Sequence, residues 1–72
     1  MTEYTARDKH HEACREVRFR ERVYARMVAV GRMKQSSADV GIALMRAIAD
    51  DYAKIVEAED AKHISVKFEV NQ

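Results

Sequence analysis

The chain has 72 residues, too few for more than one small domain, and carries a formal net charge of +1. A domain this small usually needs a disulfide, a bound metal or a partner chain to be stable. The single cysteine excludes an intrachain disulfide. We therefore expect one domain over residues 1–72, found in the cytoplasm, with no secretory signal at its polar start and no membrane-spanning stretch.

The first predicted element is an amphipathic helix over about residues 6–30. Thr5 is a helix-capping residue type, and Asp8 follows three positions later, as in a capping box. At the helical period, Ala13, Val17 and Tyr24 share one face, which we expect to be buried. Glu16 and Arg20 interrupt that face four residues apart, in the order that favours an ion pair.

The second predicted element is a helix over about residues 37–62, reached through a turn at 31–36. Gly31 suits the left-handed residue that ends a helix, and Ser36 or Ser37 suits the start of the next. A turn this short predicts that the two helices lie antiparallel. The apolar face predicted for the second helix comprises Val40, Leu44, Ala47, Ile48, Tyr52 and Ile55, with Met45 and Val56 at its edge.

An antiparallel pair of helices around this turn also predicts which residues face one another. Tyr24 is expected opposite Leu44, and Arg20 is expected to bind either Glu16 or Asp51, because a desolvated charge needs a partner. Residues 1–34 hold nine Lys/Arg and five Asp/Glu, whereas residues 35–72 hold four and seven. Opposite charges on the two halves favour their pairing, although each exposed ion pair adds only about 0–1 kcal/mol.

The last segment, about residues 64–70, changes from the helical period to strict alternation. Apolar and polar residues that alternate one by one predict a β-strand. A frayed or helical tail is the alternative. A single strand has unpaired edges that attract another chain. The predicted fold is therefore mainly α, an antiparallel two-helix hairpin with a single C-terminal strand, completed by homodimerisation into a four-helix bundle. The candidate dimer-strand residues are Ile64, Val66, Phe68 and Val70.

Residues with catalytic or metal-binding chemistry do not form a complete motif. His10 and Cys14 have the spacing of two metal ligands on a helix, but a structural zinc site needs four. The chain has no glycine-rich phosphate loop, Gly-x-Ser-x-Gly motif or His-Glu-x-x-His motif. We therefore predict no enzyme activity, metal or cofactor.

The most distinctive surface feature is a row of arginines along the first helix, spaced three and four residues apart. Such a row can bind an acidic protein surface or a phosphate backbone, or it can simply face water. Glutamates on the same helix and the low net charge favour a protein partner over nucleic acid. The candidate partner-binding residues are Arg15, Arg18, Arg22 and Arg26.

Residues 22–52 resemble small uncharacterised proteins of phages, prophages and proteobacteria. The matching positions are Arg22-Val23-Tyr24, Gly31-Arg32-Met33, Ala38-Asp39, Met45, Ile48 and Asp51-Tyr52, and many of the relatives have a bulkier residue near Met27. The resemblance implies a helical hairpin from a mobile genetic element, but no activity and no functional residue. Together with the sequence patterns, this resemblance predicts a non-catalytic protein-binding accessory factor. One form of that function is an inhibitor of a host protein or defence system in the host cytoplasm. A nucleic-acid-binding or transcription-regulatory factor is the alternative.

Overall fold

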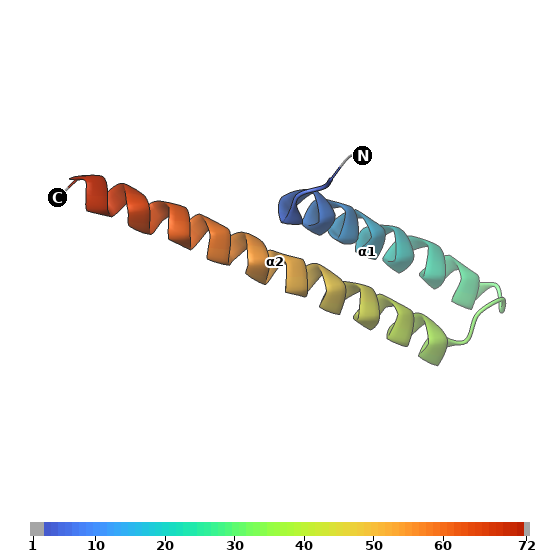
Figure 1. Ribbon diagram of the computed structural model, residues 1–72. Helices are drawn as coiled ribbons and strands as arrows, with labels where there is room; N and C mark the ends of the chain where they lie inside the picture. Colours follow the sequence, from blue (N-terminus) through green and yellow to red (C-terminus); the bar gives the residue numbers. More distant parts are fainter. Residues whose placement is uncertain (1–2, 72) are drawn as a thin grey trace.

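The protein is a helical hairpin, seen in a computed structural model that describes the backbone of residues 3–71 and the side chains of residues 3–62 (Figure 1). Helix α1 spans Ala6–Ala29 and helix α2 spans Gln35–Asn71. The helices run antiparallel, and the end of α2 extends beyond the start of α1. The molecule is elongated, measuring 61 × 29 × 14 Å. The predicted helical hairpin is confirmed.

The start of α1 is fixed by the predicted capping box. The backbone N–H of Asp8 donates to Oγ1 of Thr5 at 3.0 Å, and the backbone N–H of Thr5 donates to Oδ2 of Asp8 at 3.2 Å. These bonds satisfy donors that the first turn of a helix leaves without partners.

The end of α1 is a Schellman motif built on Gly31. This glycine has a φ of 76°, in the left-handed region, as predicted. The N–H of Gly31 donates to the carbonyl of Val28 at 3.0 Å, and the N–H of Arg32 donates to the carbonyl of Met27 at 2.8 Å. The chain therefore reverses direction while the last carbonyls of the helix remain hydrogen-bonded.

Helix α2 begins two residues earlier than predicted. The N–H of Ala38 already donates to the carbonyl of Lys34 at 3.1 Å, so Ser36 and Ser37 lie within the first turn rather than before it. The side chain of Gln35 donates to Asp39 at 2.9 Å, a contact one turn apart that helps to start the helix early.

The predicted strand over 64–70 is wrong, because α2 remains helical through to Asn71. No glycine or proline follows Gly41, and each residue added to an existing helix gains one backbone hydrogen bond. The alternating pattern of residues 64–70 therefore predicted their structure less well than the uninterrupted helix that precedes them. The side chains of the candidate dimer-strand residues, Ile64, Val66, Phe68 and Val70, lie outside the described residues.

The contact between the helices is made mainly by small residues. Ala13 on α1 and Ala38, Ala49 and Val56 on α2 are the buried hydrophobic residues of the described part. Around them Tyr24 and the other facing side chains are half-buried. The hairpin therefore has a thin core, with no large side chain fully buried among the described residues.

The face of α2 that packs against α1 is rotated from the predicted one. Half-buried and buried positions follow the heptad spacing Ala38, Ile42, Met45, Ala49, Tyr52 and Val56. Of the predicted apolar face, Tyr52 and the two edge residues, Met45 and Val56, belong to this set. Small residues at Ala38 and Ala49 let the helices approach closely, which the larger side chains of the predicted face would not allow.

Cross-helix contacts fix the register. At the open end Arg7 donates to both carboxylate oxygens of Asp60, at 3.0 and 3.1 Å, and further along Arg46 binds Glu21. Tyr24 lies against Gly41 rather than Leu44, since a Cβ built on Gly41 would be 3.1 Å from Cε2 of the Tyr24 ring. The register is thus close to the predicted one, and the rotation of α2 accounts for the difference at Tyr24.

Arg20 is held in the way that one of the two alternatives predicted. Its Nε donates to Oε1 of Glu16 at 3.0 Å, and its Nη1 donates to the backbone carbonyl of Gly41 at 2.8 Å. The guanidinium also lies 5.9 Å from the centre of the Tyr24 ring. Arg20 thereby links α1 to the backbone of α2, and the predicted alternative contact with Asp51 does not occur.

Candidate partner-binding surfaces

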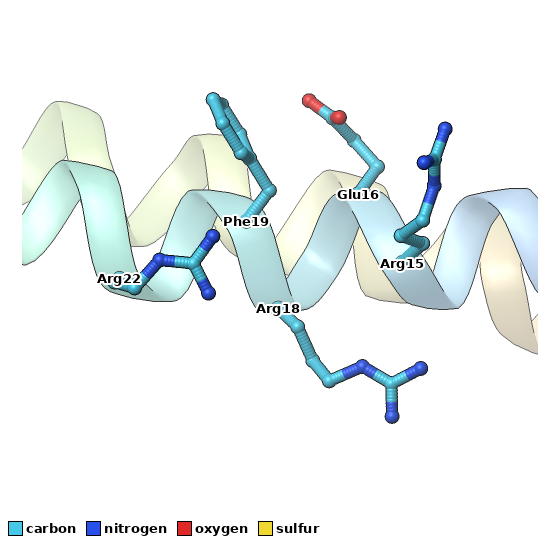
Figure 2. Close-up of a pocket in the computed structure, with 5 residues that line it drawn as sticks. All are labelled: Arg15, Glu16, Arg18, Phe19 and Arg22. Atoms are coloured by element: carbon cyan, nitrogen blue, oxygen red, sulfur yellow. The ribbon is translucent and has the colours of Figure 1, made fainter.

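The arginine stripe, defined as Arg15, Arg18, Arg22 and Arg26, lies along α1 on the side turned away from α2. All four residues are exposed, whereas Ala13, Val17 and Tyr24 on the other side are buried or half-buried. The helical period therefore places the four residues on one outward side of α1, as predicted. Their guanidinium groups spread from there, since Figure 2 shows that of Arg15 on the same side as Glu16 and that of Arg18 on the opposite side.

Arg15 differs from the other three because it has an acidic partner. Its Nη2 is 2.7 Å from Oε2 of Glu12, one turn earlier on the same helix. The hydrogen bond that Arg15 donates to Glu12 and the charge of that carboxylate raise the pKa of Arg15 above its ordinary value. Arg15 stays charged at any physiological pH, but Glu12 offsets its charge, so the net positive charge of the stripe comes from Arg18, Arg22 and Arg26.

A shallow hollow of about 540 Å³ lies beside the stripe and is lined by Arg15, Glu16, Arg18, Phe19 and Arg22. Figure 2 shows the side chains of Glu16 and Phe19 pointing to one side of α1 and that of Arg18 pointing to the other. The hollow is thus an open surface between side chains of one helix rather than an enclosed cavity. It suits contact with a surface better than it suits capture of a small molecule.

A second surface, which sequence reasoning placed inside the hairpin, is exposed. The outer apolar stripe comprises four α2 residues with exposed fractions of 44–60%, and they are Val40, Leu44, Ile48 and Ile55. These are most of the residues predicted to face α1. Their helical spacing identified an apolar face correctly, but could not tell which of two adjoining faces α1 covers.

The outer apolar stripe continues across the gap between the helices onto α1. A groove of about 310 Å³ is lined by Ile48 and Met45 from α2 and by Glu16 and Ala13, among others, from α1. Glu16 and Phe19 point to the same side of α1, and Phe19 is 47% exposed. Phe19 and the outer apolar stripe therefore lie on one lateral face of the hairpin, with the groove between them.

His10 and Cys14 contact each other on α1. Nε2 of His10 and Sγ of Cys14 are 3.3 Å apart, and both residues are half-buried. Within the described part of the chain, no group of three or more His, Cys, Asp or Glu residues could hold a metal ion. The pair supplies a thiol and a base, but the surrounding backbone N–H groups are engaged in the helix and cannot act as oxyanion donors. A hydrogen bond across one helical turn accounts for this contact.

Among the described residues, no helix is both long and apolar enough to cross a membrane. Comparison of the chain with protein-family models, with curated proteins and with solved structures gives no match. The resemblance of residues 22–52 to small phage and prophage proteins therefore stays a prediction.

Proposed function

We propose that the protein is a non-catalytic protein-binding accessory factor that acts as a homodimer and binds an acidic surface of its partner through the arginine stripe. The observation that carries this proposal is the exposure of Arg18, Arg22 and Arg26, which make no ion pair with any residue that the structure describes. Arginine is well suited to this role, because its planar guanidinium binds a carboxylate through two parallel hydrogen bonds.

The charges around the stripe favour a protein over nucleic acid as the partner. Glu12 and Glu21 lie on the same helix, and the chain carries only one net positive charge. Nucleic-acid binding gains most of its affinity from neutralising phosphates, so nearby carboxylates weaken it. A folded protein with separate acidic and apolar patches tolerates such a mixed surface.

Two further parts of the proposal rest on the sequence resemblance alone. One is an origin in a phage or prophage, and the other is action in the cytoplasm of the host. Inhibition of a host protein or defence system is the form of accessory function that suits a small binding protein from such a source.

The experiment that tests the proposal is a charge reversal of the stripe. Arg18→Glu/Arg22→Glu is compared with Arg32→Glu/Lys54→Glu, which changes the net charge equally at exposed positions outside the stripe. Partners captured from nuclease-treated host extract are identified by mass spectrometry, and the strongest is purified for calorimetry. We expect the stripe variant to bind at least about tenfold more weakly, since removing a charged hydrogen-bond pair costs roughly 1.5–3 kcal/mol. Equal affinity of the stripe variant and its control would reject the stripe as the binding surface.

A nucleic-acid-binding factor is the second candidate, favoured by the regular spacing of the stripe. Arg15 to Arg26 spans about 16 Å of helix, enough to follow several phosphates of one strand. Three arginines that each neutralise a phosphate predict a slope of about −2.7 when log K is plotted against log salt concentration for duplex DNA. A slope of that size, abolished in Arg18→Glu/Arg22→Glu, would favour this candidate over the protein partner.

A further inference from the structure

We infer that a second copy of the chain covers the lateral face formed by the outer apolar stripe and Phe19, with the turns of both hairpins at the same end of the resulting four-helix bundle. This inference rests on the homodimer of the proposed function and specifies its interface. The interface is not the predicted terminal strand, and it does not depend on what the arginine stripe binds.

Helix α2 carries two apolar heptad seams, of which α1 covers one. The covered seam runs from Ala38 to Val56 through the buried and half-buried positions. The second seam runs through Leu44, Ile48, Asp51 and Ile55 and is exposed, with Asp51 as its one charged residue. At 100° per residue the two seams lie about a quarter of a turn or slightly more apart. This is the arrangement of a helix in a four-helix bundle, which packs against two neighbours at right angles.

The same lateral face of α1 is also apolar near the turn. Phe19, Val23 and Val30 recur at seam spacing, and Phe19 and Val30 are exposed. The groove beside Ile48 and Met45 lies between the two helices on this face. A large side chain from another apolar helix face would fill this groove, and the face itself can supply Phe19 or Leu44.

The accessible surface of the single chain is larger than that of a compact monomer of the same mass. The chain has an accessible surface of 6103 Å² at a mass of 8.3 kDa. A compact monomer of this mass exposes roughly 4,600 Å², so the hairpin has about 1,500 Å² in excess, part of it on the end of α2 that extends beyond α1. A stable interface buries about 800 Å² per partner, and obligate dimers bury more. The excess is sufficient for a second copy.

The distribution of charge and of apolar residues sets the orientation. On the lateral face of α1, Phe19 and Val23 lie towards the turn, whereas Lys9 and Glu12 lie towards the open end, and on α2 the outer apolar stripe runs along the face as far as Ile55. Turns at the same end bring apolar side chains onto apolar side chains. A two-fold axis along the bundle also places each α1 against the partner's α2. Turns at opposite ends would place α1 against the partner's α1, so that Phe19 and Val23 of one chain meet the charged end of the other.

The face is tested by mass measurements on variants. Leu44→Asp/Ile48→Asp is compared with Ala43→Asp/Ala61→Asp, which adds the same charges at exposed positions on the other side of α2. Sedimentation equilibrium should give a dimer for the wild type and the control. The face variant should dissociate at least about 100-fold more readily, because two apolar side chains lose their burial. The milder Leu44→Ala should weaken the dimer about tenfold and covers the case in which the double variant unfolds.

Three results are decisive for the face. A monomeric wild type at 100 µM chain, about the upper end of ordinary working concentrations, would overturn both the homodimer and this inference. A dimeric wild type whose Leu44→Asp/Ile48→Asp and Leu44→Ala variants remain as tightly dimeric would overturn the inference alone. Dissociation of the face variants, with the control still dimeric, supports it.

The orientation is tested by a distance between spin labels. The label is placed at Lys34→Cys in the turn, in a Cys14→Ser background, since Cys14 is the chain's one cysteine. Turns at the same end predict a distance below about 25 Å between the two labels, because neighbouring helix axes are about 10 Å apart. Turns at opposite ends predict about 40 Å, the length of α1, and would overturn the orientation.

Discussion

At the scale of single residues, the two glycines have opposite roles. Gly31 supplies a backbone conformation, with a φ of 76° and open space where a Cβ would stand. Gly41 has ordinary helical geometry and supplies room, because the Tyr24 ring occupies the place next to it. The sequence predicts the first role, because Gly31 lies between two helical patterns, whereas the contact of Gly41 with Tyr24 depends on how the two helices pack.

Replacing Gly31 should destabilise the hairpin through the backbone alone. Gly31→Ala forces a Cβ into the left-handed region, which costs about 1–2 kcal/mol, without any steric contact to relieve. Gly31→Asn should cost less, since asparagine tolerates this region better. Urea unfolding followed by circular dichroism at one chain concentration measures both. An alanine variant as stable as the wild type would show that the turn does not need the left-handed residue.

Gly41 should show coupling to Tyr24. Gly41→Ala gains about 1 kcal/mol of helix propensity but brings a Cβ to 3.1 Å from the Tyr24 ring, so the two effects should nearly cancel. In a Tyr24→Ala background the ring is gone, and the same change should stabilise by about 1 kcal/mol. A double-mutant cycle of unfolding free energies measures the difference. A coupling energy near zero would mean that the ring does not lie against Gly41.

At the scale of the helices, local rules predicted most of what the structure contains. Thr5 with Asp8 gave the start of α1, and Gly31 gave its end, because both rules depend on a few neighbouring residues. The predicted packing face of α2 was rotated from the observed one. Helix α2 has apolar residues over a wide arc, and only the position of α1 decides which of them are covered. The exposed side of α1 was predicted correctly, because Arg15, Arg18, Arg22 and Arg26 lie opposite Ala13, Val17 and Tyr24 at the helical period.

The C-terminal segment illustrates the limit of periodicity. An alternating pattern over 64–70 predicted a strand, but a strand needs a neighbour and a helix does not. With no glycine or proline after Gly41, continuing α2 to Asn71 satisfies the backbone within the segment itself. Sequence alone could not weigh these two outcomes, because the partner strand would have had to come from another chain.

Deleting residues 63–72 separates the two models of the dimer. The apolar residues of the lateral face lie within residues 19–55, so the shortened chain should remain dimeric. Its helical ellipticity per molecule should fall because α2 loses its last turns. Sedimentation equilibrium and far-UV circular dichroism measure the two quantities. A monomeric product would instead assign the dimer contact to the terminal segment. The full-length chain at the same concentration is the control.

At the scale of the whole molecule, the hairpin is a thin, elongated pair of helices with a core of small residues. Its exposed ion pairs, such as Arg7 with Asp60, contribute little. Apolar burial must therefore supply most of the stability, and the lateral face, with its exposed Val40, Leu44, Ile48 and Ile55, offers further apolar area to bury. In the inferred bundle the two arginine stripes lie on opposite outer sides, so each dimer offers two equivalent binding surfaces.

The dependence of stability on chain concentration tests the central claim, that the hairpin is completed by a second copy, most directly. If folding and dimerisation are linked, the midpoint of thermal or urea unfolding rises as the chain concentration rises. We predict a clear increase in the unfolding midpoint between about 2 and 200 µM chain, steep enough to fit a two-state transition from folded dimer to unfolded monomer. A midpoint that is the same at both concentrations would contradict the account, because it would show a hairpin that folds alone.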